Sequence, residues 1–252
     1  MKKFFFSLAA LCMGMCAMAQ SCIYLHEKSG KCIEFFIENL DSISFTKGTA
    51  VISGTENGYD YVDLGLPSGL RWATMNVGAT NPKNYGNYYA WGEFATKTTY
   101  NWSTYEYANG SSTTLTKYNN SSSYGTADKK TTLEAADDAA TQIWGGNWRM
   151  PTIDEWQELI DNCTWIWTTL NGVSGYEVKA TNGNSIFLPA AGVRRSGVLV
   201  DAGSYGGYWS SSLYKGNPDY ASAQGVYFNS DSPYMNSGDR CYGQSVRPVV
   251  AR

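Results

Sequence analysis

Apolar and polar residues follow two different periods along the chain, and each period predicts a different kind of element. Between Pro151 and Cys163 apolar residues recur every three or four positions, which predicts a helix with one buried face. Thr152 and Glu155 have the spacing of a capping box at its start. The positions on the buried face are Ile153, Trp156, Leu159, Ile160 and Cys163. A second, shorter helix is expected over residues 134–144.

Short apolar or alternating runs bounded by turn residues fill most of the remaining C-terminal half, and they predict strands. Asn171-Gly172 and Asn182-Gly183-Asn184 separate three such runs in the manner of hairpin turns. The expected strands cover residues 164–170, 176–180, 185–190, 208–212, 225–229 and 245–249. A polar stretch over 100–130 is expected to be a long surface loop. The predicted fold class is α+β with few helices.

The start of the chain has the three parts of a secretory signal peptide. Lys2 and Lys3 precede a short apolar stretch, and Ala17-Met18-Ala19 supplies the small residues of a cleavage site. We therefore expect a secreted or cell-surface protein of a bacterial envelope, with lipid attachment at Cys22 as the alternative to free secretion. No later run reaches the about 18 apolar residues of a membrane span, so no transmembrane segment is predicted.

The same patterns divide the chain into four parts. A signal peptide is expected at residues 1–19 and a small β-rich module at 20–46, where two short strands and an alternating tail occur. A Gly/Thr/Ser-rich linker is expected at 47–58, and the main domain at 59–252.

Composition and charge exclude several classes of function. The 252 residues are 43% hydrophobic, which suffices for a packed core, and 16% charged, below the typical ~25%. The formal net charge is -3 and no basic cluster occurs, so nucleic acid is not an expected partner. His26 is the single histidine, which argues against a His-based metal site and a Ser-His-Asp triad. No cofactor and no metal site are predicted.

Export permits disulfides, and four cysteines follow the expected cleavage point: Cys22, Cys32, Cys163 and Cys241. In the hairpin expected near the N-terminus, Glu27 lies opposite Cys32, which places Cys22 about five residues, or roughly 16 Å, along the strand. A disulfide needs Cα atoms within ~7 Å. Cys163 and Cys241 are therefore the candidate disulfide, with both thiols unpaired as the alternative.

Several unusual motifs occur in a fixed order from residue 59 onward. They are Tyr61-Val-Asp-Leu-Gly-Leu-Pro-Ser-Gly-Leu70, Trp72-Ala-Thr, Tyr89-Ala-Trp-Gly-Glu93, Gly146-Asn-Trp-Arg-Met-Pro-Thr-Ile-Asp-Glu-Trp156, Asn184-Ser-Ile-Phe-Leu-Pro-Ala-Ala-Gly192, Tyr208-Trp-Ser-Ser-Ser212 and Ser245-Val-Arg-Pro-Val249. This series resembles the Fibrobacter succinogenes major paralogous domain family, which is common in surface proteins of gut bacteria. The resemblance implies a C-type-lectin-like fold of the formylglycine-generating-enzyme type for residues 59–252.

Two chemistries found in relatives of that fold lack their residues here. A copper oxidase of this fold uses a pair of cysteines, whereas the C-terminal region of this chain holds only Cys241. Calcium-dependent sugar lectins combine a Glu-Pro-Asn or Gln-Pro-Asp loop with a Trp-Asn-Asp strand. The tripeptide Asn217-Pro218-Asp219 is not followed by such a strand, so we interpret it as a turn. Arg149 and Arg247 are interpreted as buried arginines that bond backbone carbonyls or carboxylates such as Glu155 or Glu93.

The segment 213–243 carries the functional prediction. Of its 31 residues, 20 are Tyr, Asn, Ser, Asp, Gly or Cys, the residue types of antibody-like binding surfaces. An ordinary turn-rich surface has the same composition and is the alternative. The candidate ligand-binding residues are Tyr214, Asn217, Asp219, Tyr220, Tyr227, Tyr234, Asp239 and Tyr242.

These residue types also arise from an asparagine codon by changes at adenines, which are the substitutions that diversity-generating retroelements introduce. Relatives of the implied fold are targets of such elements. If Cys241 is a diversified position, its pairing with Cys163 is accidental, so the two hypotheses compete.

We predict a secreted or cell-surface protein that binds a protein or glycan ligand, with no catalytic residues. The alternatives are a carbohydrate-binding accessory protein and a structural surface protein without a dedicated ligand. An enzyme is the least favoured, because no spacing singles out a pair among Glu93, Asp137, Asp138 and Glu155.

Overall fold

The computed structural model describes residues 22–26, 32–36, 53–214 and 222–251. The chain divides into two compact units, residues 1–47 and residues 48–252. The predicted signal peptide at 1–19 lies outside the described residues, as does the part of the predicted linker before residue 53.

The described part of the first unit is an antiparallel hairpin of β1 (Cys22–His26) and β2 (Cys32–Phe36). His26, rather than the predicted Glu27, is paired with Cys32, and Cys22 is paired with Phe36. The two cysteines therefore lie four residues, or roughly 13 Å, apart along the hairpin, beyond the reach of a disulfide.

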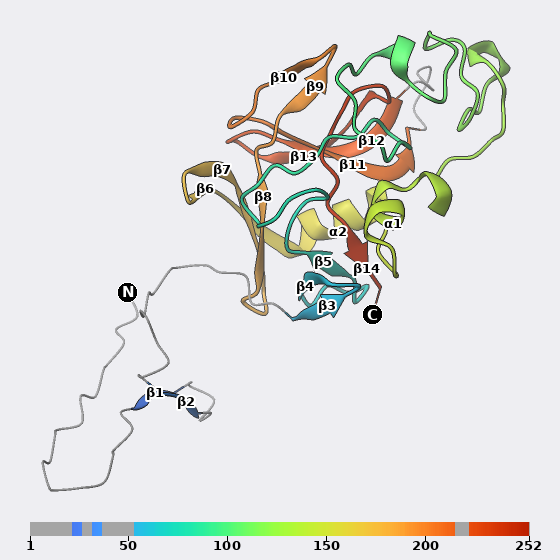
Figure 1. The fold of residues 1–252 in the computed structure, drawn as a ribbon. Helices are drawn as coiled ribbons and strands as arrows, with labels where there is room; N and C mark the ends of the chain where they lie inside the picture. Colours follow the sequence, from blue (N-terminus) through green and yellow to red (C-terminus); the bar gives the residue numbers. More distant parts are fainter. Residues whose placement is uncertain (1–21, 27–31, 37–52, 215–221, 252) are drawn as a thin grey trace, which may run out of the picture. The chain divides into compact units, whose positions relative to one another are not determined.

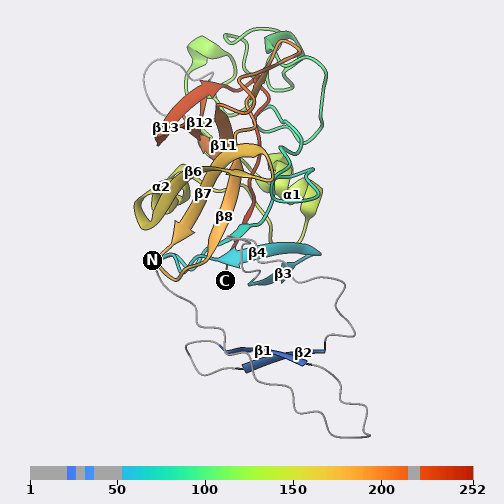
Figure 2. The ribbon, with the colours of Figure 1, turned by 90° about the vertical axis from the view of Figure 1, so that its left-hand side faces the viewer.

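The second unit is built from four small sheets and two α-helices (Figures 1 and 2). A four-stranded sheet has the order β14 (Val249–Val250), β5 (Arg71–Ala73), β4 (Tyr59–Asp63), β3 (Gly54–Glu56). Two three-stranded sheets contain β6 (Cys163–Leu170), β7 (Val173–Ala180) and β8 (Ser185–Pro189), and β11 (Gly206–Leu213), β12 (Ser222–Phe228) and β13 (Pro233–Asp239). The fourth is the hairpin of β9 (Val193–Arg195) and β10 (Val198–Val200). Because β3 starts at Gly54 and pairs with β4, part of the segment predicted as a linker belongs to a sheet.

The main helix forms where its apolar spacing predicted it. Helix α2 spans Ile153–Asn162, with Thr152 and Glu155 forming the expected capping box. Trp156 and Leu159 are buried, and the helix packs against β6, β11 and β12 (Figure 1). The expected helix over 134–144 is instead divided at Asp138 into a 3₁₀ turn, η4 (Ala135–Asp137), and helix α1 (Ala139–Trp144). The division arises because the Asp138 side chain accepts a hydrogen bond from Thr141 N and so begins a new helix.

The predicted α+β fold class is wrong, because the protein is mostly β. Strands account for 38% of the structure and helices for 13%, with only two α-helices of six and ten residues in the described part. Six of the described strands were not predicted: β3, β4 and β5, the two strands of the β9–β10 hairpin, and β13. Their runs are short or polar, so hydrophobic period alone does not reveal them.

The hairpin predicted between residues 176–180 and 185–190 is formed by β7 and β8, which pair antiparallel. Strands β6 and β7 form a second hairpin around Asn171-Gly172. Asn171 and Gly172 have φ values of 49° and 83°, the left-handed pair that a type I′ turn requires. The predicted strand over 245–249 is reduced to Val249–Val250, which pairs with β5. The end of the described chain thus lies at the same sheet as residues 54–73 (Figures 1 and 2).

Three buried clusters hold the second unit together. The first lies around α2 and contains the rings of Trp72, Trp156, Tyr176, Tyr208 and Phe228. The second contains Trp91, Trp144, Trp148 and Trp209. The third is built from Tyr88, Tyr100, Tyr105, Ala191 and Cys241. Aromatic rings dominate all three, and they bury large areas per residue at modest entropic cost.

The two arginines expected in buried positions have the predicted roles. Arg247 is fully buried and donates to the carbonyls of Ala73 and Phe187 and to the Asn76 side chain. Arg149 is half-buried and forms a bidentate ion pair with Glu155. Arg247 therefore joins segments that are distant in sequence, whereas Arg149 ties the start of α2 to the residues just before it.

The candidate disulfide between Cys163 and Cys241 is wrong, because both thiols are free. Cys163 packs at the edge of the first cluster, whereas Cys241 is buried in the third. Burial raises the pKa of the Cys163 thiol to about 11 and that of Cys241 to about 12. Both side chains therefore stay protonated and unreactive near neutral pH.

The segment 100–130 is irregular, as predicted, but it is not merely a surface loop. It contains the short 3₁₀ turns η2 (Trp102–Thr104) and η3 (Ser122–Tyr124). Tyr100, Tyr105 and Tyr118 are each at most 2% exposed, so the segment contributes rings to the second and third clusters.

Candidate functional site

A group of tyrosines gathers where β12 and β13 meet the β9–β10 hairpin and the 239–242 turn. We call it the tyrosine face and define it by six residues: Tyr205, Tyr227, Tyr234, Tyr242, Arg195 and Asp239. Its members come from β9, the loop before β11, β12, β13 and the turn that follows β13.

Strand register places two of the rings side by side. Tyr227 of β12 is the direct cross-strand partner of Tyr234 of β13, and their rings stack at 6.3 Å between centroids. The Tyr205 ring centroid lies 5.9 Å from that of Tyr227, and the Tyr205 hydroxyl is hydrogen-bonded to Tyr234. Since side chains alternate along a strand, the neighbouring Val226 and Phe228 point to the opposite face and join the first cluster. One face of the sheet therefore packs against the first cluster. The other face carries Tyr227 and Tyr234 at one end and, further along, Trp209 and Ala223, which are buried in the second cluster.

Glycines make the room in which the Tyr227 ring lies. Gly207 is the cross-strand partner of Tyr227 on β11. A Cβ atom at Gly238 would lie 2.6 Å from the Tyr227 hydroxyl, closer than side-chain atoms can approach. The Gln244 amide donates a hydrogen bond of 2.9 Å to the same hydroxyl, which fixes the ring in place.

The β9–β10 hairpin carries Arg195 to the tyrosines. Its turn residues Ser196 and Gly197 have φ values of 45° and 88°, as a tight type I′ turn requires. The Arg195 guanidinium lies 4.8 Å from the centroid of the Tyr242 ring, a cation–π contact. Arg195 is exposed, and within the described residues no carboxylate lies within 4.0 Å of its guanidinium. Its charge is thus available to a ligand.

A buried arginine holds the turn that presents Asp239 and Tyr242. Tyr242 N donates to the Asp239 carbonyl at 2.9 Å, which closes the turn. Between them Arg240 is fully buried and donates to the carbonyls of Lys117 and Tyr118 at 3.2 and 3.0 Å. The turn is therefore anchored to the 100–130 segment beneath it.

The hydroxyls of Tyr205, Tyr227 and Tyr242 remain protonated across the physiological range. Burial raises the pKa of Tyr227 and of Tyr205 well above the usual value near 10. Burial, followed by a hydrogen bond to Asp239, raises the pKa of Tyr242 to about 12. Each hydroxyl therefore offers both a donor and an acceptor, and recognition by these groups is insensitive to pH near neutrality.

Exposure within the face is graded from a buried floor to an open rim. Tyr227 is 4% exposed, whereas Tyr234 is 39% exposed. Tyr205, Tyr242 and Asp239 are half-buried. The face can thus bury apolar ring area against a partner while its hydroxyls, one cation and one carboxylate orient that partner.

The eight candidate binding residues have different places in the structure. Tyr227, Tyr234, Asp239 and Tyr242 are brought together, although the nearly complete burial of Tyr227 makes it a support rather than a contact. Tyr214 lies after β11, next to Ser222, and is seven residues, roughly 20 Å, along the chain from the Gly207 that pairs with Tyr227. Asn217, Asp219 and Tyr220 lie outside the described residues.

Arg195 and Tyr205 were missed because they precede the Tyr-rich segment in sequence. A local signal for Arg195 does exist. Val193 and the apolar run 198–200 flank Arg-Arg-Ser-Gly, which is the pattern of a short hairpin with a glycine turn. No local pattern marks Tyr205, whose role depends on contacts with a strand 20 residues later.

The four acids that could have served an enzyme are engaged in structural contacts. Glu93 pairs with Lys97, Asp137 with Lys117, and Glu155 with Arg149. Asp138 caps α1 and accepts from Met150 N, and its burial raises the pKa of its carboxyl.

In the part of the chain that the structure covers, no group of three or more His, Cys, Asp or Glu is placed to hold a metal ion. None of the helices described there is long and apolar enough to cross a membrane.

No protein-family model matches the chain, and no curated protein or solved structure gives a significant match. The C-type-lectin-like fold implied by the motif resemblance therefore has no matching structure to support it. The resemblance to the major paralogous domain family stays a prediction.

Proposed function

We propose that this protein is a secreted or cell-surface binding protein that recognises a protein or glycan ligand through the tyrosine face. One observation carries the proposal: the partly exposed rings of Tyr205 and Tyr234 pack against the buried ring of Tyr227, on a sheet whose other face is core. Tyrosine offers a large amphipathic area with few rotatable bonds, so little conformational entropy is lost on binding.

Charge and apolar area around the rings support the same function. Arg195 and Asp239 bring opposite charges to one face, which favours a ligand with a defined orientation. Val198 is 61% exposed and is the cross-strand partner of Arg195, so it adds apolar surface at the margin of the face. A rim of mixed polarity around apolar anchors is typical of binding sites.

Export through a signal peptide at residues 1–19 is part of the proposal. We expect the mature protein to begin at Gln20, which N-terminal sequencing of the exported protein measures. A lipidated Cys22 at the mature N-terminus would indicate the anchored alternative, and an uncleaved Met1 would contradict export by this route.

Diversification by a retroelement is the narrower form of the proposal, and burial limits which positions can vary. A side chain at Gly225 would meet the Tyr208 carbonyl at 2.3 Å, and Cys241 is 1% exposed. We therefore expect variation between isolates to concentrate at Tyr234, Asp239 and Tyr242. Sequencing the locus across isolates tests this, and substitutions scattered evenly over the gene would contradict it.

The binding function is tested with a variant in which Tyr234, Tyr242 and Asp239 are all replaced by Ala. Wild-type protein is first screened on a glycan array and on a displayed peptide library. The hits are then measured with the variant and with a control in which the exposed residues Thr164 and Lys179 on another sheet are replaced by Ala. We expect the variant to lose binding and the control to keep it, with melting temperatures close to that of the wild type.

Three outcomes separate the alternatives. Hits confined to glycans favour a carbohydrate-binding accessory protein, and no hit on either surface favours a structural role. A large loss of melting temperature in the variant would place its three residues in the core and contradict the proposal.

A further inference from the structure

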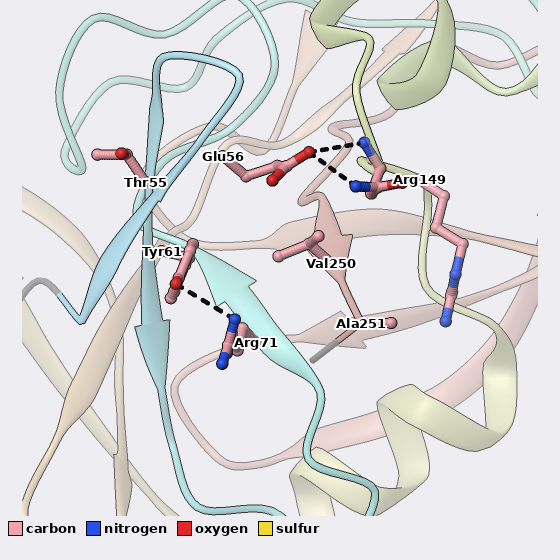
Figure 3. Close-up of a pocket in the computed structure, with 8 residues that line it drawn as sticks. Thr55, Glu56, Tyr61, Arg71, Arg149, Val250 and Ala251 are labelled. Carbon is pink, nitrogen blue, oxygen red and sulfur yellow. Dashed lines mark hydrogen bonds between the residues drawn. The ribbon is translucent and has the colours of Figure 1, made fainter.

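A hollow remote from the tyrosine face in sequence lies on the four-stranded sheet, and its chemistry differs from that of the face. It has a cavity volume of about 490 Å³ and is lined by Thr55, Glu56, Tyr61, Arg71, Asn147, Arg149, Val250 and Ala251 (Figure 3). Cavities of roughly 300–1,000 Å³ with a few converging polar groups are typical of small-molecule sites.

Because side chains alternate along β4 and β5, polar side chains of this sheet point towards the hollow. In β4 and β5, Val62 and Trp72 are cross-strand partners and are buried in the first cluster. Arg71 precedes Trp72, so it points to the opposite face, where its cross-strand partner on β14 is Val250. Figure 3 shows Arg71 next to Tyr61 at one side of the hollow.

Arg71 is the cation of the hollow that has no salt-bridge partner within 4.0 Å among the described residues, although Asp63 is its cross-strand partner on β4. Its Nη1 donates to the Tyr61 hydroxyl at 3.2 Å, and its guanidinium lies 4.9 Å from the Tyr61 ring centroid. Its Nε is buried without a hydrogen-bond partner, and within the described residues no carboxylate is within 4.0 Å of the guanidinium. A buried donor left unpaired is costly, so such a group calls for a partner.

The second arginine differs, because its charge is already matched. Both Nη atoms of Arg149 bond to the Glu155 carboxylate, which leaves Arg71 as the group that can take a carboxylate in bidentate geometry. The Tyr61 hydroxyl accepts from Arg71 and keeps its own proton to donate to the same anion.

Glu56 supplies an acceptor at another side of the hollow. Its Oε1 accepts from Asn147 N and Nδ2, each at 3.0 Å, and its Oε2 accepts no hydrogen bond within the described residues. Trp148 Nε1 also donates to the Glu56 carbonyl at 2.8 Å. Gly146, at φ 60°, permits this approach, because a Cβ there would lie 2.7 Å from Oε1. The 146–148 segment is therefore held firmly against Glu56 of β3.

We propose that this hollow binds a small carboxylate that also carries hydrogen-bond donors, with the carboxylate on Arg71 and Tyr61 and the donors on Glu56. A plain carboxylate would be repelled by Glu56, whereas an ammonium or hydroxyl group near the carboxylate turns that contact into an attraction. Two sources share this chemistry: an amino acid and a sugar acid.

Two pairs of probes separate the chemistry. Alanine and propionate differ by the ammonium group, and glucuronate and glucose differ by the carboxylate. Binding is followed by NMR through the Arg71 Nε–H and the Trp148 indole N–H. We expect alanine or glucuronate to shift both signals with a Kd on the order of 1 mM, and propionate and glucose to shift neither. Binding of alanine identifies the ligand as an amino acid, and binding of glucuronate identifies it as a sugar acid.

Variants of the lining test the assignment. Arg71→Gln is expected to weaken binding about tenfold or more, Arg71→Lys less, and Glu56→Gln to reduce the preference for alanine over propionate. Lys179→Gln removes one exposed positive charge elsewhere and serves as the matched control. Unchanged indole spectra apart from the site verify that the variants are folded.

The proposal is overturned if neither alanine nor glucuronate shifts the Arg71 signal. It is also overturned if folded Arg71→Gln or Arg71→Lys binds as well as the wild type. Because no residue of the tyrosine face is involved, these results are independent of the proposed recognition function.

Discussion

Two segments of similar composition have opposite fates in this protein. Residues 100–130 and residues 222–242 are both rich in Tyr, Ser, Asn and Gly. In the first segment Tyr100, Tyr105 and Tyr118 are buried, whereas in the second Tyr234 is 39% exposed and Tyr242 is half-buried. Composition therefore does not determine whether a tyrosine becomes core or surface.

Internal hydrogen-bond partners explain the burial of the first group. The hydroxyl of Tyr100 donates to the Tyr88 carbonyl at 2.6 Å, and that of Tyr105 donates to the Trp91 carbonyl at 2.8 Å. The Tyr118 hydroxyl bonds to the Asp137 carboxylate. A tyrosine can be buried at little cost when its hydroxyl is bonded, because no polar group is then left without a partner.

Strand parity explains the second group. Tyr227 and Tyr234 are cross-strand partners, and both point away from the face that carries Val226 and Met235. Only the central strand is covered further, by the Gln244 side chain and Tyr205, so Tyr227 is buried and its partner on the edge strand is not. The comparison teaches that burial follows from partners supplied by other segments.

The largest effect on stability is expected from removing the side chain that ties the two segments together. We expect Arg240→Ala to lower the free energy of unfolding by about 3 kcal/mol, because two buried carbonyls lose their donor and a cavity opens between Trp91 and Tyr105. Urea unfolding measures the loss, with Lys179→Ala as the control. Amide exchange should accelerate more in 100–130 than in β6–β8, and equal acceleration in both would contradict the anchoring role.

A smaller effect is expected from the carboxylate that holds the first segment. Asp137 accepts hydrogen bonds from Tyr107, Lys117 and Tyr118. Asp137→Asn removes the charge while nearly preserving the shape, so we expect a loss of about 1–3 kcal/mol in the free energy of unfolding at pH 7. Chemical unfolding of both proteins at the same ionic strength measures the difference.

The sign of the pH dependence follows from the pKa of Asp137. Burial by itself would raise this pKa, but the hydrogen bonds from Lys117, Tyr118 and Tyr107 outweigh it and the pKa is lowered. A lowered pKa contributes stability above the unfolded-state value, and that contribution is lost as pH falls through the folded-state value. The difference between wild type and Asp137→Asn should therefore shrink from pH 7 towards pH 3. A difference that grows on acidification would contradict this account.

The smallest effect on stability is expected from replacing the exposed tyrosine of the second segment. Tyr234→Ala, on the edge strand, is expected to lower the free energy of unfolding by no more than about 1 kcal/mol, because a substantial part of the ring is already in water. Thermal and urea unfolding measure it, and Tyr234→Phe separates the ring from the hydroxyl. A loss as large as that of Arg240→Ala would show that Tyr234 belongs to the core.

Local patterns predicted those elements whose determinants lie within a few residues. Helix α2 was predictable because Thr152 and Glu155 cap it and its apolar positions repeat every turn. The β7–β8 hairpin was predictable because the Asn182-Gly183-Asn184 turn separates two strand-like runs. The division of residues 134–144 into η4 and α1 was not predicted, because apolar spacing does not show that the Asp138 side chain accepts from Thr141 N and begins a new helix there.

The residue types of the candidate site were predictable from the sequence, but the individual residues that form it were not. Composition drew attention to Tyr227, Tyr234, Asp239 and Tyr242, and the structure brings these four together. It could not distinguish Tyr227 from Tyr234, and it offered nothing on Arg195 or Tyr205. Those distinctions depend on β-strand pairing and on an adjacent hairpin.

What the sequence alone determined are the properties that arise from neighbouring residues: one capped helix, several turns, an absence of basic clusters and a polar-aromatic tail. Only the tertiary structure decided that the protein is mostly β, that Cys163 and Cys241 lie in different clusters, and that no carboxylate of the described residues lies within 4.0 Å of the Arg71 guanidinium. The reason is physical. Burial, pairing and unpaired charge are relations between segments distant in sequence, and each one depends on which segments pack against each other.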